Sequence, residues 1–114
     1  MEVPEKIRED IVRLQSLQQK LQSLMMQKQN IQMQVVEADN ALKELGNKQA
    51  SEDVYEIVGA IMLKKDVGEL SKTLTERKDI FELRSKSYDK QVKNVNEDLK
   101  KLQENIASSL KEKK

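Results

Sequence analysis

The chain has 114 residues, of which 21 are basic and 20 acidic, so it is highly charged while its formal net charge is only +1. It has three aromatic residues and no Trp, Cys or His. A chain of this length forms at most one domain, and with so few rings it is not expected to build the aromatic-rich core of an ordinary globular domain. Disulfides, thiolate or imidazole metal sites and the usual nucleophile and base are excluded. We expect an elongated or oligomeric protein with no metal, no cofactor and no enzymatic activity.

The apolar and charged residues are distributed in a way that predicts neither a membrane nor a nucleic-acid partner. The longest uninterrupted apolar run, Ile57 to Leu63, is about a third of the roughly 20 residues that a membrane-spanning helix needs. Met1 is followed by charges and not by an apolar signal segment. Basic residues are neither clustered nor interleaved with aromatics, as a nucleic-acid surface would require. We therefore expect a soluble, cytoplasmic protein.

An apolar seam with a period of 3.5 residues runs through residues 1–46. Alternating steps of three and four residues reach thirteen positions, of which eleven are apolar. The thirteen positions are Val3, Ile7, Asp10, Leu14, Leu17, Leu21, Leu24, Lys28, Ile31, Val35, Ala38, Leu42 and Leu45. Sustained over six heptads, this pattern predicts one strand of a coiled coil. Lys28 interrupts the seam as a register-setting or snorkelling residue. Gly46 and Asn47 can adopt the left-handed conformation that ends helices.

A second seam with the same period runs through residues 67–114. Nine of its thirteen positions are apolar. The thirteen positions are Val67, Ser71, Leu74, Lys78, Phe81, Ser85, Tyr88, Val92, Val95, Leu99, Leu102, Ile106 and Ser109. Four further residues lie beside it and widen the apolar face: Leu70, Ile80, Leu83 and Leu110. Two such helices can lie antiparallel. If Leu45 pairs with Leu70, three more layers follow: Val35 with Phe81, Leu21 with Val95, and Leu14 with Leu102.

The segment 51–66 between the seams has a different chemistry. β-Branched, aromatic and other apolar residues gather at Val54, Tyr55, Ile57, Val58, Ile61 and Leu63. Gly59 marks a tight turn, which predicts a hairpin with strands at 54–58 and 60–64. The alternative, a continuous helix, would place Gly59 and Gly68 inside it. Because an isolated hairpin is marginal in water, we expect it to assemble with hairpins of other subunits.

Together these elements resemble the beta-type subunit of archaeal prefoldin. The most specific part is residues 54–84, where Tyr55, Val58 and Gly59 are followed by the pairs Glu69-Leu70 and Glu76-Arg77. Beta-type chains carry one hairpin, and this sequence has room for only one. The resemblance implies a mainly α fold in a single domain, a long antiparallel two-helix coiled coil whose central hairpin joins an inter-subunit β-barrel.

The resemblance also implies a function. Two alpha-type and four beta-type chains would form a hexameric, ATP-independent chaperone that holds unfolded polypeptides and delivers them to a group II chaperonin. The distal tips of the coiled coil would bind clients. The residues themselves support this, because the apolar seam continues to both chain ends and the terminal residues then have partners on one side only. The candidate client-binding residues are Val3, Ile7, Ile11, Leu14, Leu99, Leu102, Ile106 and Leu110. Ordinary seam packing with frayed tips is the alternative.

Other features allow more than one interpretation. The basic tail, with Lys111, Lys113 and Lys114, is either a chaperonin contact or a solvated helix end. Exposed methionines suit promiscuous binding, but contact with a neighbouring subunit or simple tolerance is the competing explanation for Met25, Met26 and Met33. A structural tether would explain the helices but not the hairpin. An enzyme would have to rely on Glu52 with Asp53, or on Lys64 with Lys65, without a pocket.

Overall fold

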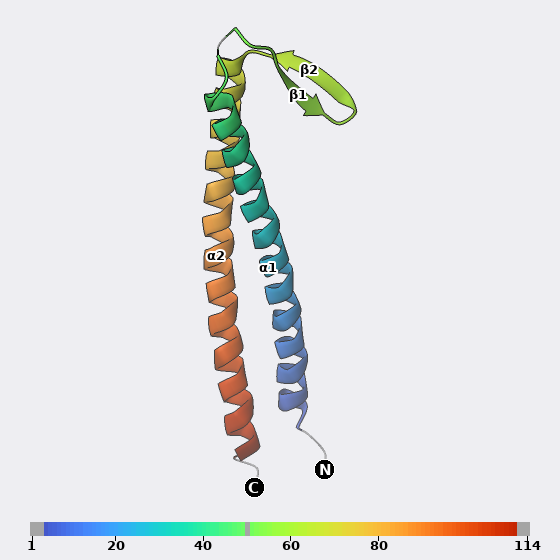
Figure 1. Cartoon of the computed structure of the whole chain (residues 1–114). Coiled ribbons are helices and arrows are strands. Elements are labelled where there is room, and N and C mark those ends of the chain that lie inside the picture. Colours follow the sequence, from blue (N-terminus) through green and yellow to red (C-terminus); the bar gives the residue numbers. More distant parts are fainter. Residues whose placement is uncertain (1–3, 50, 112–114) are drawn as a thin grey trace. The chain divides into compact units, whose positions relative to one another are not determined.

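The computed structural model describes residues 4–49 and 51–111, in which two long helices flank one β-hairpin (Figure 1). Helix α1 spans Glu5–Gly46, strand β1 Val54–Val58, strand β2 Ile61–Lys65 and helix α2 Val67–Lys111. The chain forms two compact units, which we call the terminal unit (1–29 and 86–114) and the hairpin unit (30–85). In each unit a segment of α1 packs antiparallel to a segment of α2. The predicted mainly helical fold with one central hairpin is confirmed.

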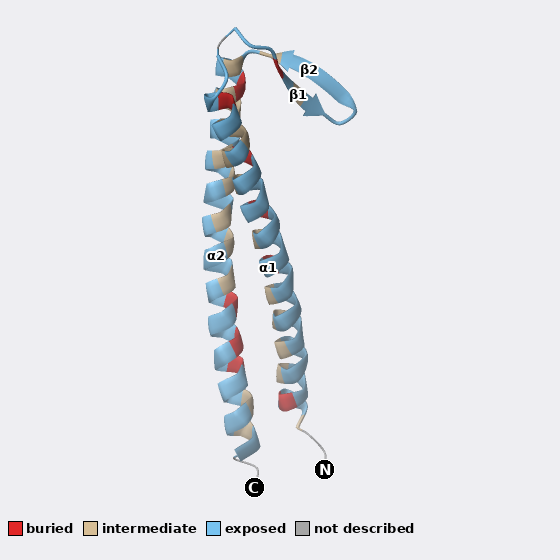
Figure 2. Cartoon of the chain, viewed as in Figure 1, coloured by how far each residue is buried: buried red, intermediate tan, exposed pale blue. Residues whose placement is uncertain are grey.

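The helices pack through the predicted seams. Every described seam position of both helices is buried or half-buried, and Figure 2 shows these positions on the facing sides of the helices within each unit. In the terminal unit the core consists of Leu24, Val95 and Leu99. Five half-buried side chains pack against it: Leu14, Leu17, Leu21, Tyr88 and Val92. Leu21 and Val95, predicted to share a layer, therefore belong to the same packed cluster.

The hairpin unit has its own core at the end where the helices meet the hairpin. Leu45, Leu70 and Val54 form a buried cluster, with Val67 and Leu74 packed against it. The pairing of Leu45 with Leu70 confirms the predicted register at this end. Burying a side chain of this size contributes about 1.5–3 kcal/mol. Because Val54 is the first residue of β1, this cluster fastens the hairpin to both helices.

Helix α1 ends differently from the prediction. Its last turn is closed by the Asn47 amide, which donates to the Glu44 carbonyl at 3.2 Å, and by the Lys48 amide, which donates to the Leu45 carbonyl at 3.0 Å. Neither Gly46 nor Asn47 has a positive φ. The predicted left-handed cap is wrong, because a tightened last turn already satisfies these carbonyl groups.

Helix α2 begins with a cap that sequence analysis missed. The Asp66 carboxylate accepts a hydrogen bond from the Glu69 amide at 3.1 Å, and the Asp66 carbonyl accepts one from the Leu70 amide at 2.9 Å. Aspartate is a favoured residue at this position because its side chain satisfies an otherwise unpaired amide. Gly68 keeps the space beside it open, since a Cβ there would lie 3.1 Å from Asp66 Oδ2.

The hairpin has a two-residue turn at Gly59 and Ala60. Gly59 has a φ of 60° and Ala60 does not have a positive φ, the pattern of a type II′ turn, in which glycine takes the first central position. Strand β1 agrees with the prediction, whereas β2 runs over 61–65 and not over 60–64. The shift arises because Ala60 belongs to the turn, which pairs Val58 with Ile61.

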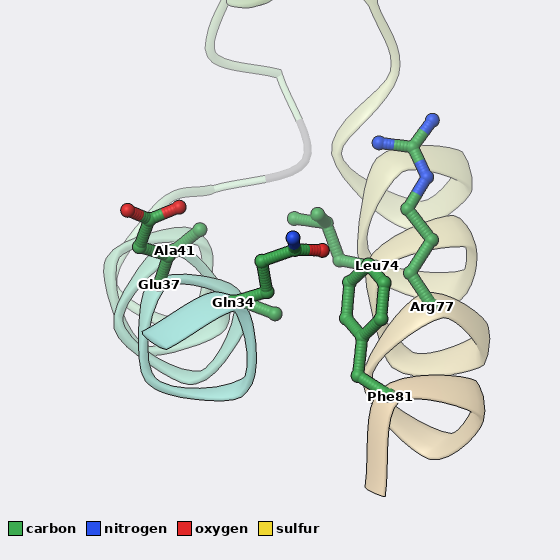
Figure 3. A pocket seen from close by; sticks show the side chains of 7 residues that line it. Gln34, Glu37, Ala41, Leu74, Arg77 and Phe81 are labelled. Atoms are coloured by element: carbon green, nitrogen blue, oxygen red, sulfur yellow. The ribbon is translucent and has the colours of Figure 1, made fainter. Parts of the chain in front are cut away.

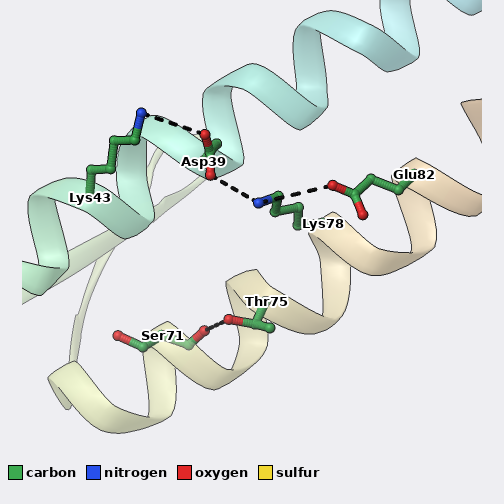
Figure 4. A network of polar contacts seen from close by, with 6 residues as sticks. All are labelled: Asp39, Lys43, Ser71, Thr75, Lys78 and Glu82. Atoms are coloured by element: carbon green, nitrogen blue, oxygen red, sulfur yellow. Dashed lines mark hydrogen bonds and ion pairs between the residues drawn. The ribbon is translucent and has the colours of Figure 1, made fainter.

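Two lysines occupy seam positions, and each is neutralised by a carboxylate from the opposite helix. Lys28 pairs with Asp89 in the terminal unit. In the hairpin unit Lys78 Nζ lies 2.9 Å from Asp39 Oδ1 (Figure 4). This hydrogen bond is the main reason why the pKa of Asp39 is lowered and the pKa of Lys78 raised. A polar pair inside an apolar seam favours one register over its alternatives.

Candidate functional site

The hairpin exposes apolar side chains on both of its faces. Strand pairing places Val58, Ile61 and Leu63 on one face, and Tyr55, Ile57 and Met62 on the other. Their exposed fractions range from 42% for Leu63 to 70% for Ile57. Within the described residues the sheet has two strands only, so both outer edges also present unpaired backbone groups. Such a hairpin is unfavourable in water unless another chain covers it.

Two contacts hold the hairpin to its own helices. Val54 is 9% exposed and belongs to the core with Leu45 and Leu70. The Arg77 guanidinium on α2 donates to Glu56 Oε1 on β1 at 3.1 Å. Of the six residues predicted for assembly, Val54 therefore packs inside its own chain, whereas Tyr55, Ile57, Val58, Ile61 and Leu63 are accessible.

Two hollows lie next to these contacts in the hairpin unit. One, of about 400 Å³, is lined by Ile57 and Met62 of the hairpin and by Leu70 of α2, among others. The other, of about 420 Å³, lies between the helices, where the small side chains of Ala38 and Ala41 leave space opposite Phe81 (Figure 3). Gln34, Glu37, Leu74 and Arg77 complete its lining. Neither hollow contains an arrangement of nucleophile, base and oxyanion donors.

The charged pairs considered for catalysis form exposed ion pairs. Lys64 Nζ lies 3.1 Å from Asp53 Oδ1, and Lys48 Nζ lies 3.7 Å from Glu52 Oε2. The Asp53 hydrogen bond is the main cause of a raised pKa of Lys64, which keeps this amine protonated and poorly suited as a base. Among residues 4–49 and 51–111, no group of three acidic, His or Cys residues could hold a metal ion. None of the described helices is long and apolar enough to cross a membrane.

The residues predicted for client binding are placed in two different environments. Ile7, Leu99 and Leu102 are 2%, 8% and 7% exposed and are buried in the terminal unit. Leu14 and Ile106 are half-buried. Ile11 and Leu110 are exposed, by 39% and 54%. The N-terminal candidate, Val3, lies outside the described residues.

Three accessible apolar residues of the terminal unit were not among these candidates. Val12, Met25 and Met26 are 64%, 55% and 63% exposed. They lie one or two positions after a seam residue. The sequence indicates Met25 and Met26 as exposed methionines suited to promiscuous binding, whereas it does not single out Val12. Lys111 is exposed at the end of α2, whereas Lys113 and Lys114 of the predicted basic tail lie outside the described residues.

The comparisons with known proteins agree with one another. A family model described as "Prefoldin subunit" matches residues 8–113. The chain is 36% identical to the prefoldin subunit beta of Sulfurisphaera tokodaii, over 91% of this chain and 83% of that protein. It is also 36% identical to the prefoldin subunit beta of Methanothrix thermoacetophila, over 96% of this chain and 91% of that one. The crystal structure of the prefoldin beta subunit from Thermococcus strain KS-1 is similar, with a TM-score of 0.85 and 32% identity over 96% of each chain.

Proposed function

The chain belongs to the prefoldin family, and from this premise we propose that it is a beta-type subunit of a hexameric, ATP-independent chaperone in the cytoplasm. In this proposal two alpha-type and four beta-type chains assemble, hold unfolded polypeptides and pass them to a group II chaperonin. The whole chain, with its coiled-coil segments at 1–46 and 67–114 and its hairpin segment at 51–66, would act as one prefoldin-like domain.

The observation that carries this proposal is the hairpin with apolar residues exposed on both faces. A closed barrel of several hairpins would bury its inner face and pair both edges of each hairpin, which an isolated hairpin cannot do. Ile57 and Met62 on one face, and Ile61 and Leu63 on the other, are the apolar residues available for the barrel interior and for further contacts on its outside. A tether would need two helices but not this hairpin, so the chaperone function accounts for more of the chain.

Client capture is proposed for the ends of the helices in the terminal unit. Ile11 and Leu110 are exposed there, and Leu14 and Ile106 are half-buried, so they can contact a client while Ile7, Leu99 and Leu102 maintain the helix pair. Each chain end offers only a small apolar area. Several subunits must bind one client together, so that weak contacts sum through multivalency. The basic tail from Lys111 onward would contribute mainly to the rate of encounter with the chaperonin.

The experiment that tests this function removes residues 1–10 and 103–114, which include Ile7, Ile106 and Leu110. The truncated chain keeps the hairpin and the Leu24, Val95 and Leu99 core, so we expect it to assemble with the alpha-type chain. Suppression of the aggregation of a denatured protein should fall steeply. As a control, Lys93→Gln with Lys100→Gln changes exposed polar positions only and should leave protection unchanged. A truncated hexamer that protects clients as well as the full chain would contradict capture by the chain ends.

A further inference from the structure

The outward face of α1 in the terminal unit carries no charged residue between positions 11 and 29. Its residues are separated by three, four or seven positions along the helix and so share one side. All of them are exposed, and we call them the uncharged face: Ile11, Val12, Gln15, Gln18, Gln19, Gln22, Met25, Met26 and Gln29. The charged residues within this range lie elsewhere. The helical period places Arg13 and Lys20 on the opposite flank of the seam, and Lys28 occupies the seam and pairs with Asp89.

The segment of α2 in the same unit has an ordinary solvated surface. Its exposed positions carry ten charged residues: Lys86, Asp89, Lys90, Lys93, Glu97, Asp98, Lys100, Lys101, Glu104 and Lys111. Charged side chains make up 36% of the chain, and a solvated helix face normally carries its share of them. The uncharged face therefore differs from the surface of its helical partner, although both segments are exposed to the same extent by the seam packing.

The side chains of the uncharged face match the chemistry of an unfolded polypeptide. Val12, Met25 and Met26 are more than half exposed, and the unbranched, polarizable methionine side chain adapts to apolar groups of different shapes. Each glutamine amide both donates and accepts hydrogen bonds without a charge that must be desolvated. An extended chain offers apolar side chains together with backbone N–H and C=O groups. Such a surface would bind many sequences and disfavour densely charged ones.

The size of the face argues against a permanent complex with a second copy of the chain. At 1.5 Å per residue and a helix diameter of about 10 Å, positions 11–29 cover roughly 300 Å². A stable interface buries about 800 Å² on each partner. The available area therefore suits a weak, reversible contact. Weak contacts are useful to a holdase that must release its client and that presents several copies of the same face.

We propose that the uncharged face of α1 is a binding surface for extended, uncharged segments of unfolded polypeptides. The proposal rests on the chaperone function proposed above and adds a second contact region to the chain ends. Clients would lie along the side of α1, with apolar residues against Met25 and Met26 and backbone groups against the glutamine amides. The seam and the hairpin are not used.

The test introduces charge of either sign on this face in the full chain, assembled with its alpha-type partner. Gln15→Glu with Gln22→Glu, and Gln15→Lys with Gln22→Lys, change two exposed positions without altering the seam. The matched control is Gln91→Glu with Asn94→Glu, on exposed positions of α2 in the same unit and away from the chain end. Clients are reduced, denatured lysozyme, which is basic, and reduced α-lactalbumin, which is acidic. Light scattering and circular dichroism verify that assembly and helix content are unchanged.

Both charged versions of the face should protect both clients less well. The chaperone concentration needed to suppress aggregation should rise by roughly threefold or more, while the α2 control protects normally. A photoreactive side chain introduced at Gln22 should crosslink denatured lysozyme, and one at Gln91 should not. Unchanged protection by both charged versions would overturn the proposal, as would effects that only follow the sign of the client's charge. If the parent assembly protects neither client, the chaperone function itself fails, and that result is separate from the failure of this face.

Discussion

The seam of the terminal unit and the hairpin of the hairpin unit both consist of apolar side chains, but they expose them to very different extents. In the seam, Leu24, Val95 and Leu99 are 4–8% exposed because the opposite helix of the same chain covers them. In the hairpin, Ile57, Ile61 and Met62 are 61–70% exposed, and their own chain leaves them uncovered. The difference separates the apolar surface that the chain covers by itself from the apolar surface that another subunit would cover in the proposed assembly.

The two regions also differ in how they tolerate polar neighbours. The helix seams accommodate Lys28 in the terminal unit and Lys78 in the hairpin unit because Asp89 and Asp39 on the opposite helix neutralise them. The exposed apolar residues of the hairpin have no comparable polar partner within the described chain, and the Arg77–Glu56 pair lies at its attachment to the helices. A charge placed on the hairpin would therefore be buried on assembly without compensation.

The largest effect should come from a charge on the hairpin. Ile57→Lys or Ile61→Lys would bury an ammonium group in the inter-subunit interface, at a cost of several kcal/mol, so the assembly should dissociate while helix content stays high. Light scattering measures the mass and circular dichroism the helicity. Asn47→Lys adds the same charge at an exposed loop position and should assemble normally. A fully hexameric Ile57→Lys variant would show that the joint between subunits lies elsewhere.

An intermediate effect is expected from a cavity in the seam. Leu24→Ala removes the centre of the terminal-unit core and should destabilise the helix pair by about 2–3 kcal/mol. Faster hydrogen exchange should be confined to residues of the terminal unit, and the oligomer should keep its mass, since the hairpin is untouched. Met26→Ala is the matched control, because Met26 is 63% exposed. Dissociation of the Leu24→Ala assembly would mean that the two regions are not independent.

The smallest effect concerns the Asp39–Lys78 pair. Because the pKa of Asp39 is lowered, Asp39 contributes to the free energy of unfolding above the ordinary aspartate pKa of about 3.9. This contribution is lost as the pH falls through the lower pKa of the folded state. Because the pKa of Lys78 is raised, its contribution to the free energy of unfolding is complete below the ordinary lysine pKa of about 10.4. It is lost as the pH rises through the higher pKa of the folded state.

Asp39→Asn should therefore lower the melting temperature slightly at neutral pH and match the parent chain in strong acid, where the carboxylate is protonated in both states. Thermal melts followed by circular dichroism across the acid range provide the measurement. Glu37→Gln removes a nearby exposed carboxylate that has no cross-helix partner in the described structure and should shift the melts less. An Asp39→Asn chain that is less stable by the same amount in strong acid would exclude the ion pair as the cause.

The local periodicity of the sequence determined most of the architecture. A 3.5-residue repeat places every third or fourth residue on one helix face whatever lies opposite, so the seams could be read without a structure. The hairpin was predictable for a similar reason, because β-branched residues around Gly59 favour a strand, a tight turn and a second strand. Even the pairing of Leu45 with Leu70 followed from matching two seams of equal length.

Only the tertiary structure decided which apolar residues remain accessible. Leu102 and Ile106 are both seam positions and both candidate client-binding residues, but Leu102 is 7% exposed whereas Ile106 is only half-buried. Exposure depends on what packs from far along the chain, which a local repeat does not encode. The same holds for the end of α1, where a tightened turn replaced the expected left-handed cap, and for the Asp66 cap of α2. Each is a choice between several ways of satisfying the same backbone groups, and the surrounding packing selects one of them.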